Sequence, residues 1–410
     1  MSRMNSQSRV GHRFIVLVSS QVLSQLGNNF FSLALLWYVL KITGSRSDVA
    51  IMAALQVFPN VFSLFAGTFA DRMNRWNLMI ITDISRFAIA GLIAGLGFGH
   101  LLSIWILGGL VFLLQLTGTF FTPAEMAVFP SMVSQEALAT ANGINQALTM
   151  VSQLVGMALG GLLLVIVGPF TLMLLNSVSF IISVVALLFI KPRNTEMPDG
   201  SALHQKTTFS DDWKDGIKEV LKQKTLRMLI PIAVIVNFAL APIMSLDAPW
   251  IKQVLHLQAT QYGLVGASMM LGIMVGNIFV GYLNTRVSFR RLLPIGLAVM
   301  AGCVICLSQI PVYLVTITCM IGFGIAAGVI NASLFTLIQK ITPGPLLGRV
   351  SGVMFSFTTI SLPIGMAVGS ALAVHVSLAF IFAGGGVLAA IGAVLSLLIP
   401  DSVNVRPRTS

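Results

Sequence analysis

The sequence predicts an all-α integral membrane protein with twelve transmembrane helices in two pseudo-symmetric six-helix bundles. Of its 410 residues, 56% are hydrophobic and 9% are charged. The mean hydropathy is +0.92. A single soluble core could not remove so much apolar surface from water. Apolar runs such as residues 14–40, 101–128 and 378–398 are long enough to cross a bilayer as helices, since ~30 Å of hydrocarbon takes about 20 residues.

Polar, charged, glycine and proline residues divide the chain into twelve apolar spans. These cover approximately residues 14–41, 49–70, 77–98, 101–131, 138–166, 168–190, 228–254, 260–284, 292–309, 311–340, 347–375 and 377–399. The first span is too long for a cleaved signal peptide and ends abruptly at Lys41, so we expect it to be a retained helix.

The basic residues predict the orientation of these spans. With the N-terminus inside, 20 of the 24 lysines and arginines fall on one side of the membrane. Lys41, Arg46 and Lys252 fall on the other side, and Arg86 lies within a span. The positive-inside rule therefore places both termini in the cytoplasm. The net charge of +11 reflects this topology, and we expect no nucleic-acid partner.

One long polar stretch, residues 192–226, separates two bundles at residues 1–191 and 227–410. Within this linker, residues 210–224 carry acids near the start, bases near the end and apolar side chains on one side. This pattern predicts a short amphipathic helix on the inner membrane surface. A separate regulatory domain is disfavoured because the linker is too short to form a core.

The two halves of the sequence resemble each other. Residues 138–161 and 347–370 align without gaps and match at 8 of 24 positions, where chance would give about two. Asn28 and Asn237 are separated by the same offset of 209. A charged motif also recurs in part: Gly67, Asp71, Arg72 and Arg75 are echoed by Gly281, Arg286 and Arg290. Duplicated bundles of this kind move against each other in secondary transporters.

The whole chain resembles a major facilitator superfamily transporter, because G-x-x-x-D-R-x-x-R at residues 67–75 resembles motif A of that superfamily. The segment FFTPAEMAVFPSMVSQEALATANG at 120–143, together with Asp83, resembles the macrolide-efflux and drug:proton antiporter subgroup. The resemblance implies the major facilitator fold and a location in the inner (cytoplasmic) membrane of a bacterium. We expect the protein to be a monomer embedded in membrane lipid.

In the superfamily, the motif A aspartate contacts the inner end of span 11, which implies a partner near Gly352. We therefore expect an inner latch formed by Gly67, Asp71, Arg72 and Arg75. Gly67 would let a neighbouring helix approach closely. The counterpart at Gly281, Arg286 and Arg290 has Thr285 in place of the acid, so the latch should be asymmetric. A solvated loop would explain the arginines, but it would not explain the acid or the recurrence of the motif.

No nucleotide-binding, zinc-protease or hydrolase motif is present, so we expect no cofactor and no enzyme activity. Uphill transport would then draw on an ion gradient, most simply of protons. The candidate coupling residues are Asp83, Arg86, Glu125 and Asp247. Asp83 and Arg86 lie one turn apart and can pair. Because span 3 is peripheral in the superfamily's architecture, the resemblance favours a structural or latch-supporting pair over a substrate contact. Asp247 has the alternative of a carboxylate near a helix end.

Polar residues inside the spans are candidates for the substrate cavity: Gln21, Gln25, Asn28, Gln115, Gln146, Asn237 and Asn331. Gln115 is the strongly polar residue of span 4 where many drug antiporters carry an arginine, so sodium coupling or uncoupled export stays open. In span 5, polar residues merge with Gly156, Gly160 and Gly161, which equally indicates close helix packing.

Few fixed charges and many phenylalanine and methionine residues favour a small amphipathic substrate. We therefore expect export of drug- or macrolide-type compounds by alternating access. Two alternatives are an exporter or flippase of an endogenous amphiphile, such as a siderophore or lysolipid, and a non-transporting receptor. The cysteines at 303, 306 and 319 are interpreted as buried spectator thiols, and we expect no metal site.

Overall fold

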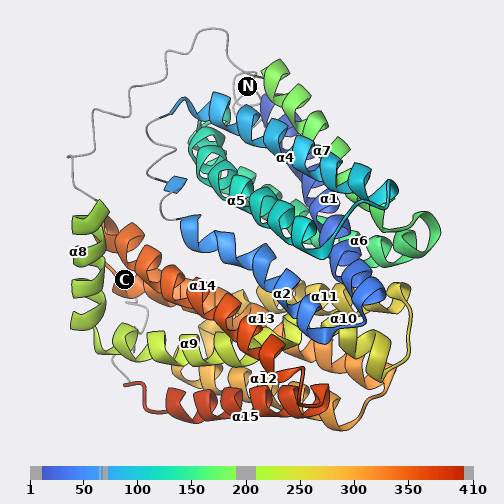
Figure 1. Cartoon of the computed structure of the whole chain (residues 1–410). Helices are drawn as coiled ribbons and strands as arrows, with labels where there is room; N and C mark the ends of the chain where they lie inside the picture. Colours follow the sequence, from blue (N-terminus) through green and yellow to red (C-terminus); the bar gives the residue numbers. More distant parts are fainter. Residues whose placement is uncertain (1–11, 64–65, 68–72, 191–208, 401–410) are drawn as a thin grey trace, which may run out of the picture. The chain divides into compact units, whose positions relative to one another are not determined.

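The computed structural model describes residues 12–63, 66–67, 73–190 and 209–400 (Figure 1). These residues form helices joined by short connections. Ten of the helices are long and apolar enough to cross a membrane. Their exposed surfaces carry large apolar side chains such as Trp105 and Phe189, which are 86% and 83% exposed. Surfaces of this kind are stable against lipid and not against water.

The chain divides into two compact units. Unit 1 comprises Met1–Ile42, Leu55–His204 and Ala259–Gly263. Its helices are α1 (His12–Thr43), α4 (Arg75–Phe98), α5 (Ile104–Val128), α6 (Leu138–Val167) and α7 (Pro169–Ile190), with the 3₁₀ turns η1 (Phe58–Phe62) and η2 (Phe129–Met132).

Unit 2 comprises Thr43–Ala54, Gln205–Gln258 and Leu264–Ser410. Its longer helices are α9 (Lys224–Ser245), α11 (Ala259–Arg286), α12 (Phe289–Gln309), α13 (Tyr313–Ile341), α14 (Leu347–Leu372) and α15 (Leu378–Ser396). The shorter elements are α2 (Arg46–Val57), α8 (Phe209–Lys222), α10 (Asp247–Pro249), the π-helical turn η4 (Trp250–Val254) and the 3₁₀ turn η5 (Gly344–Leu346).

Twelve continuous spans were expected, and two of them are interrupted. The expected span at 49–70 changes from α-helix to 3₁₀ helix at Phe58, where Pro59 follows. The expected span at 228–254 ends as an α-helix at Ser245, four residues before Pro249, and continues as α10 and η4. Proline removes a backbone donor and clashes with the preceding turn, which explains both breaks.

The boundaries of the compact units also differ from the bundles that the linker suggests. Thr43–Ala54 precedes the linker in the sequence, yet it belongs to unit 2. Arg46 Nε donates to Gln253 Oε1 over 2.6 Å. Ser370 Oγ donates to the carbonyl of Ser47 over 3.0 Å. These long-range polar contacts assign the start of α2 to unit 2.

Glycines allow close backbone contact between α11 and α13 in unit 2. A Cβ atom at Gly272 or Gly276 would lie 2.3 Å from a carbonyl oxygen of α13. At Gly324 and Gly328 it would lie 2.3 and 2.5 Å from carbonyl oxygens of α11. Helices in lipid gain stability from such close packing because no hydrophobic effect drives them together. The sequence analysis missed this contact, although G-x-x-x-G occurs in both helices.

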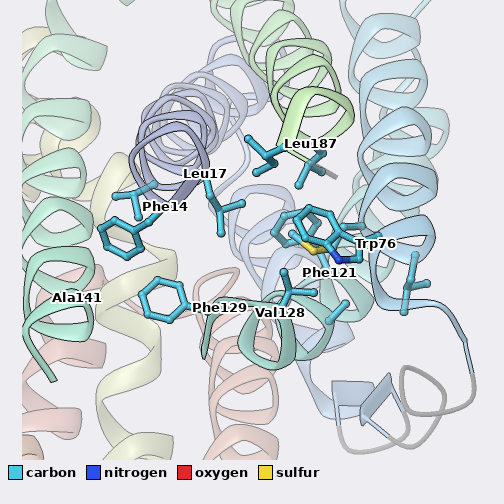
Figure 2. Close-up of a cluster of buried hydrophobic side chains, with 13 residues drawn as sticks. Phe14, Leu17, Trp76, Phe121, Val128, Phe129, Ala141 and Leu187 are labelled. Atoms are coloured by element: carbon cyan, nitrogen blue, oxygen red, sulfur yellow. The ribbon is translucent and has the colours of Figure 1, made fainter. Parts of the chain in front are cut away.

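An apolar cluster in unit 1 joins α1, α4, α5 and α7 (Figure 2). Phe14 and Phe129 meet edge to face, with ring centroids 5.3 Å apart. Trp76 and Met79 from α4 belong to the same cluster. This packing fixes the first turns of α4, and therefore the direction of the polar side chains one and two turns further along the helix.

Candidate ion-coupling site

α4 presents an ion pair to the interior of unit 1. Asn74 caps the helix, because its side chain accepts hydrogen bonds from the backbone N–H groups of Trp76 and Asn77. Two turns later, Arg86 Nη1 lies 3.3 Å from Asp83 Oδ1. The two side chains are 12% and 1% exposed, respectively. The pair expected from the spacing is therefore present, and it is buried.

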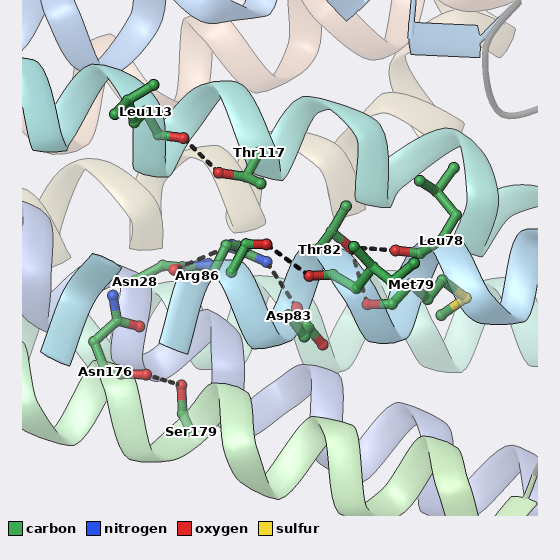
Figure 3. Close-up of polar contacts among 12 residues, drawn as sticks. Asn28, Leu78, Met79, Thr82, Asp83, Arg86, Leu113, Thr117, Asn176 and Ser179 are labelled. Carbon is green, nitrogen blue, oxygen red and sulfur yellow. Dashed lines mark hydrogen bonds and ion pairs between the residues drawn. The ribbon is translucent and has the colours of Figure 1, made fainter. Parts of the chain in front are cut away.

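Arg86 also contacts three other helices. Figure 3 shows its hydrogen bond with Asn28 and its pair with Asp83. Its Nη2 donates to Asn28 Oδ1 of α1 over 3.3 Å. Its guanidinium carbon lies 4.0 Å from the ring centre of Phe180 in α7 and 5.9 Å from that of Phe121 in α5. A desolvated cation over an aromatic ring gains about 2 kcal/mol. Arg86 is thus the side chain at which α1, α4, α5 and α7 meet.

Glu125 supplies a second carboxylate from α5, one turn after Phe121. It interacts electrostatically with both Asp83 and Arg86. The guanidinium pairs with Asp83, and the charge of Glu125 acts on both without a direct ion pair among the described residues. When both are ionised the cluster carries one excess negative charge, and one added proton makes it neutral. We name Asn28, Asp83, Arg86 and Glu125 the coupling cluster.

The coupling cluster has spare hydrogen-bonding capacity. Asp83 Oδ2 and Arg86 Nε are buried and have no hydrogen-bond partner among the described residues. Ser183 of α7 lies near the Asp83 carboxylate, but its Oγ makes no hydrogen bond among the described residues. Buried unsatisfied groups cost about 1–3 kcal/mol each and call for an explanation.

Asp247, the acidic candidate in unit 2, has a different environment. Asp247 begins α10, and its Oδ1 accepts a hydrogen bond from the N–H of Ala248 over 2.7 Å. A carboxylate at a helix start is stabilised by exposed N–H groups and the helix dipole. This geometry matches the helix-end alternative for Asp247.

The cavity candidates are divided between the two units: five belong to unit 1, and Asn237 and Asn331 belong to unit 2. Asn28 joins the coupling cluster, whereas its repeat partner Asn237 donates to the carbonyl of Ala233 in its own helix. Gln146 and Asn331 are exposed. The other three are half-buried: Gln21, Gln25 and Gln115.

The glycines of α6 favour the packing interpretation of span 5. A Cβ atom at Gly156 would lie 2.9 Å from Asn29 Cβ, and one at Gly160 would lie 3.2 Å from Phe30. At Gly161 it would lie 2.5 Å from the carbonyl oxygen of Ala259. Close helix contacts therefore explain the glycines of this stripe.

The inner latch stays a prediction, because Asp71 and Arg72 lie outside the described residues. Within them, a Cβ atom at Gly67, Gly281 or Gly352 would meet no atom within 4 Å. Arg75 begins α4.

The second-half counterpart of the latch is partly described. The guanidinium of Arg286 lies over the ring of Tyr282, 4.3 Å from its centre. Arg290 lies in the first turn of α12 and is exposed.

A buried polar face of α7 was missed by the sequence analysis. Asn176, Ser177, Ser179 and Ser183 are all buried in unit 1. Ser177 Oγ donates to the carbonyl of Phe87 over 2.8 Å and so links α7 to α4. The repeated small polar residues of NSVSFIIS at 176–183 were the available signal.

Residues 10–407 match the family model described as "Transmembrane secretion effector". The chain belongs to this family of major facilitator superfamily transporters. It is a multi-pass membrane protein with the major facilitator fold and a secondary transporter, and its family is one of transporters rather than enzymes.

Curated relatives and solved structures agree with this assignment. The chain is 28% identical over 380 residues to multidrug efflux pump Tap of Mycobacterium tuberculosis (strain ATCC 25618 / H37Rv), covering 88% of this chain and 86% of Tap. It is 22% identical to macrolide efflux protein A of Streptococcus pyogenes, covering 86% and 87%. A bacterial homologue of the iron transporter ferroportin superposes with a TM-score of 0.71 at 18% identity, covering 94% and 98%.

Proposed function

We propose that this transporter exports amphipathic or hydrophobic compounds of the drug or macrolide type in exchange for protons. The relatives named as multidrug and macrolide efflux proteins support the substrate class. The coupling cluster supports the energy source, because two carboxylates and one guanidinium are placed together inside a membrane-spanning unit. Ionisable groups inside a membrane are expensive and mark ion pathways.

The cluster suggests how a proton changes the helix contacts. With Glu125 and Asp83 both ionised, Arg86 is attracted by two negative charges from α4 and α5. Protonation of Glu125 removes one of them, so Arg86 interacts more strongly with Asp83 and Asn28. Because Asn28 belongs to α1, the proton then alters the contact between α1 and α4. If the carboxylate binds a proton from outside the cell and releases it to the cytoplasm, the inward movement of protons would drive the export of substrate.

Transport in proteoliposomes tests this proposal. We would impose a pH gradient and measure the movement of a lipophilic dye and a macrolide, with a sodium gradient as the alternative energy source. Glu125→Gln should abolish gradient-driven transport and retain passive exchange. Glu136→Gln is the matched control, because Glu136 is an exposed glutamate between α5 and α6. Unchanged pH dependence in Glu125→Gln would contradict the coupling role.

The substrate panel separates the remaining possibilities. Loss of dye accumulation in cells that express the protein supports drug export. Transport of a lysolipid or siderophore without transport of drugs would favour an endogenous amphiphile. The absence of any transport, together with ligand binding, would favour a receptor. The cytoplasmic placement of both termini is part of the proposal, and cysteine labelling of the two ends from each side of the membrane tests it.

A further inference from the structure

Helix α8 (Phe209–Lys222) has two faces with different partners. The expected amphipathic helix at 210–224 is confirmed by α8. Gly216 and Val220 are buried, whereas Lys214, Lys218 and Lys222 are exposed. At 100° per residue, the three lysines follow one line along the helix, opposite to Gly216 and Val220. One face of α8 is therefore packed against other helices, and the lysine face is exposed.

The packed face contacts the start of α14 in unit 2. A Cβ atom at Gly216 would lie 2.8 Å from the carbonyl oxygen of Arg349, so the two helices approach closely there. Arg349 Nη1 lies 3.1 Å from Asp215 Oδ2. Trp213 stacks on Phe357 with ring centroids 6.4 Å apart. Backbone, ionic and aromatic contacts together hold α8 against α14.

The end of α8 lies where membrane spans begin and end. One residue, Gln223, separates α8 from α9. Gln223 Nε2 donates to the carbonyl of Ile341, the last residue of α13, over 3.0 Å. Since α9, α13 and α14 are long and apolar enough to span a membrane, α8 lies at their ends. We therefore expect α8 to lie near the lipid headgroups.

The free face combines positive charge with apolar surface. The side chains of Lys218 and Lys222 are 69% and 73% exposed. They lie 3.7 Å from Asp215 and 3.8 Å from Glu219, respectively. Such exposed pairs are worth little, so the ammonium groups can exchange these partners for others. Leu221 lies beside this line and is 54% exposed.

We propose that Lys214, Lys218 and Lys222 bind the phosphates of anionic phospholipids, with Leu221 entering the interface, so that lipid holds α8 against α14. Clusters of basic residues beside membrane spans attract anionic headgroups. Apolar side chains on the same surface add affinity for the interfacial region. The inference rests on the cytoplasmic placement of the linker in the proposed function, but not on the substrate or the coupling ion.

The test uses the full-length protein in nanodiscs of phosphatidylcholine, with and without phosphatidylglycerol. The measurement is the midpoint of thermal unfolding as the phosphatidylglycerol fraction is titrated. We expect phosphatidylglycerol to raise the midpoint of the wild type. The variant Lys214→Gln/Lys218→Gln/Lys222→Gln should need about tenfold more phosphatidylglycerol for the same shift, since each basic residue near an anionic surface contributes measurable binding.

Two control variants separate the lysine face from net charge. The triple lysine-to-arginine variant at the same positions keeps the charge and should retain the full shift. Lys41→Gln removes an exposed positive charge from the side of the membrane expected to be opposite to α8 and should also retain it. An undiminished shift in the lysine-to-glutamine variant would overturn the proposal. So would a wild type that does not respond to phosphatidylglycerol, as expected if an acidic protein were the partner of this face. Neither result depends on transport.

Discussion

Replacing Arg86 with methionine should strongly destabilise unit 1. Methionine fills much of the space of arginine but leaves Asp83 as a carboxylate that is 1% exposed and has no opposite charge. Removing one partner of a buried ion pair costs about 3–5 kcal/mol. The contact with Phe180 is lost as well, at about 2 kcal/mol when desolvated. Because the terms overlap, we expect a loss of about 4 kcal/mol in the free energy of unfolding.

A double variant tests whether the charge itself is the cause. Asp83→Asn/Arg86→Met removes both ions, so no uncompensated charge remains and most of the stability should return. Chemical denaturation of the purified protein in detergent measures both variants against the wild type. If Arg86→Met were as stable as the wild type, or no less stable than the double variant, the pair could not be a buried interaction of this kind.

Three further predictions concern the packing of α11 on α13, the inner latch and Asp247. Gly276→Ala should lower the unfolding midpoint, because its Cβ atom would lie 2.3 Å from the carbonyl oxygen of Ile325, whereas Gly302→Ala has no atom within 4 Å and should not. Asp71→Asn should reduce transport severalfold at unchanged expression on immunoblots; wild-type turnover would remove the latch. Asp247→Asn should leave the pH dependence of transport unchanged, because Asp247 caps the backbone of Ala248; a shifted pH profile would restore it as a coupling residue.

The sequence determined the features that depend on local periodicity and composition. The lengths of the apolar segments were enough to locate most of the spans. A helix in lipid must be long enough to cross the bilayer and must satisfy its own backbone hydrogen bonds. The spacing of Asp83 and Arg86 was enough to predict their pair, since residues three apart share a helix face. The alternation of apolar and charged residues likewise predicted α8.

The tertiary structure decided which separated residues meet. Nothing in the spacing of Asn28, Glu125 and Phe180 shows that all three surround Arg86, because they lie on different helices whose rotations are set by packing. The same holds for the start of α2, which belongs to unit 2 through Arg46 and Ser47. A helix sequence specifies its own faces, but side-chain packing between helices selects which faces come into contact.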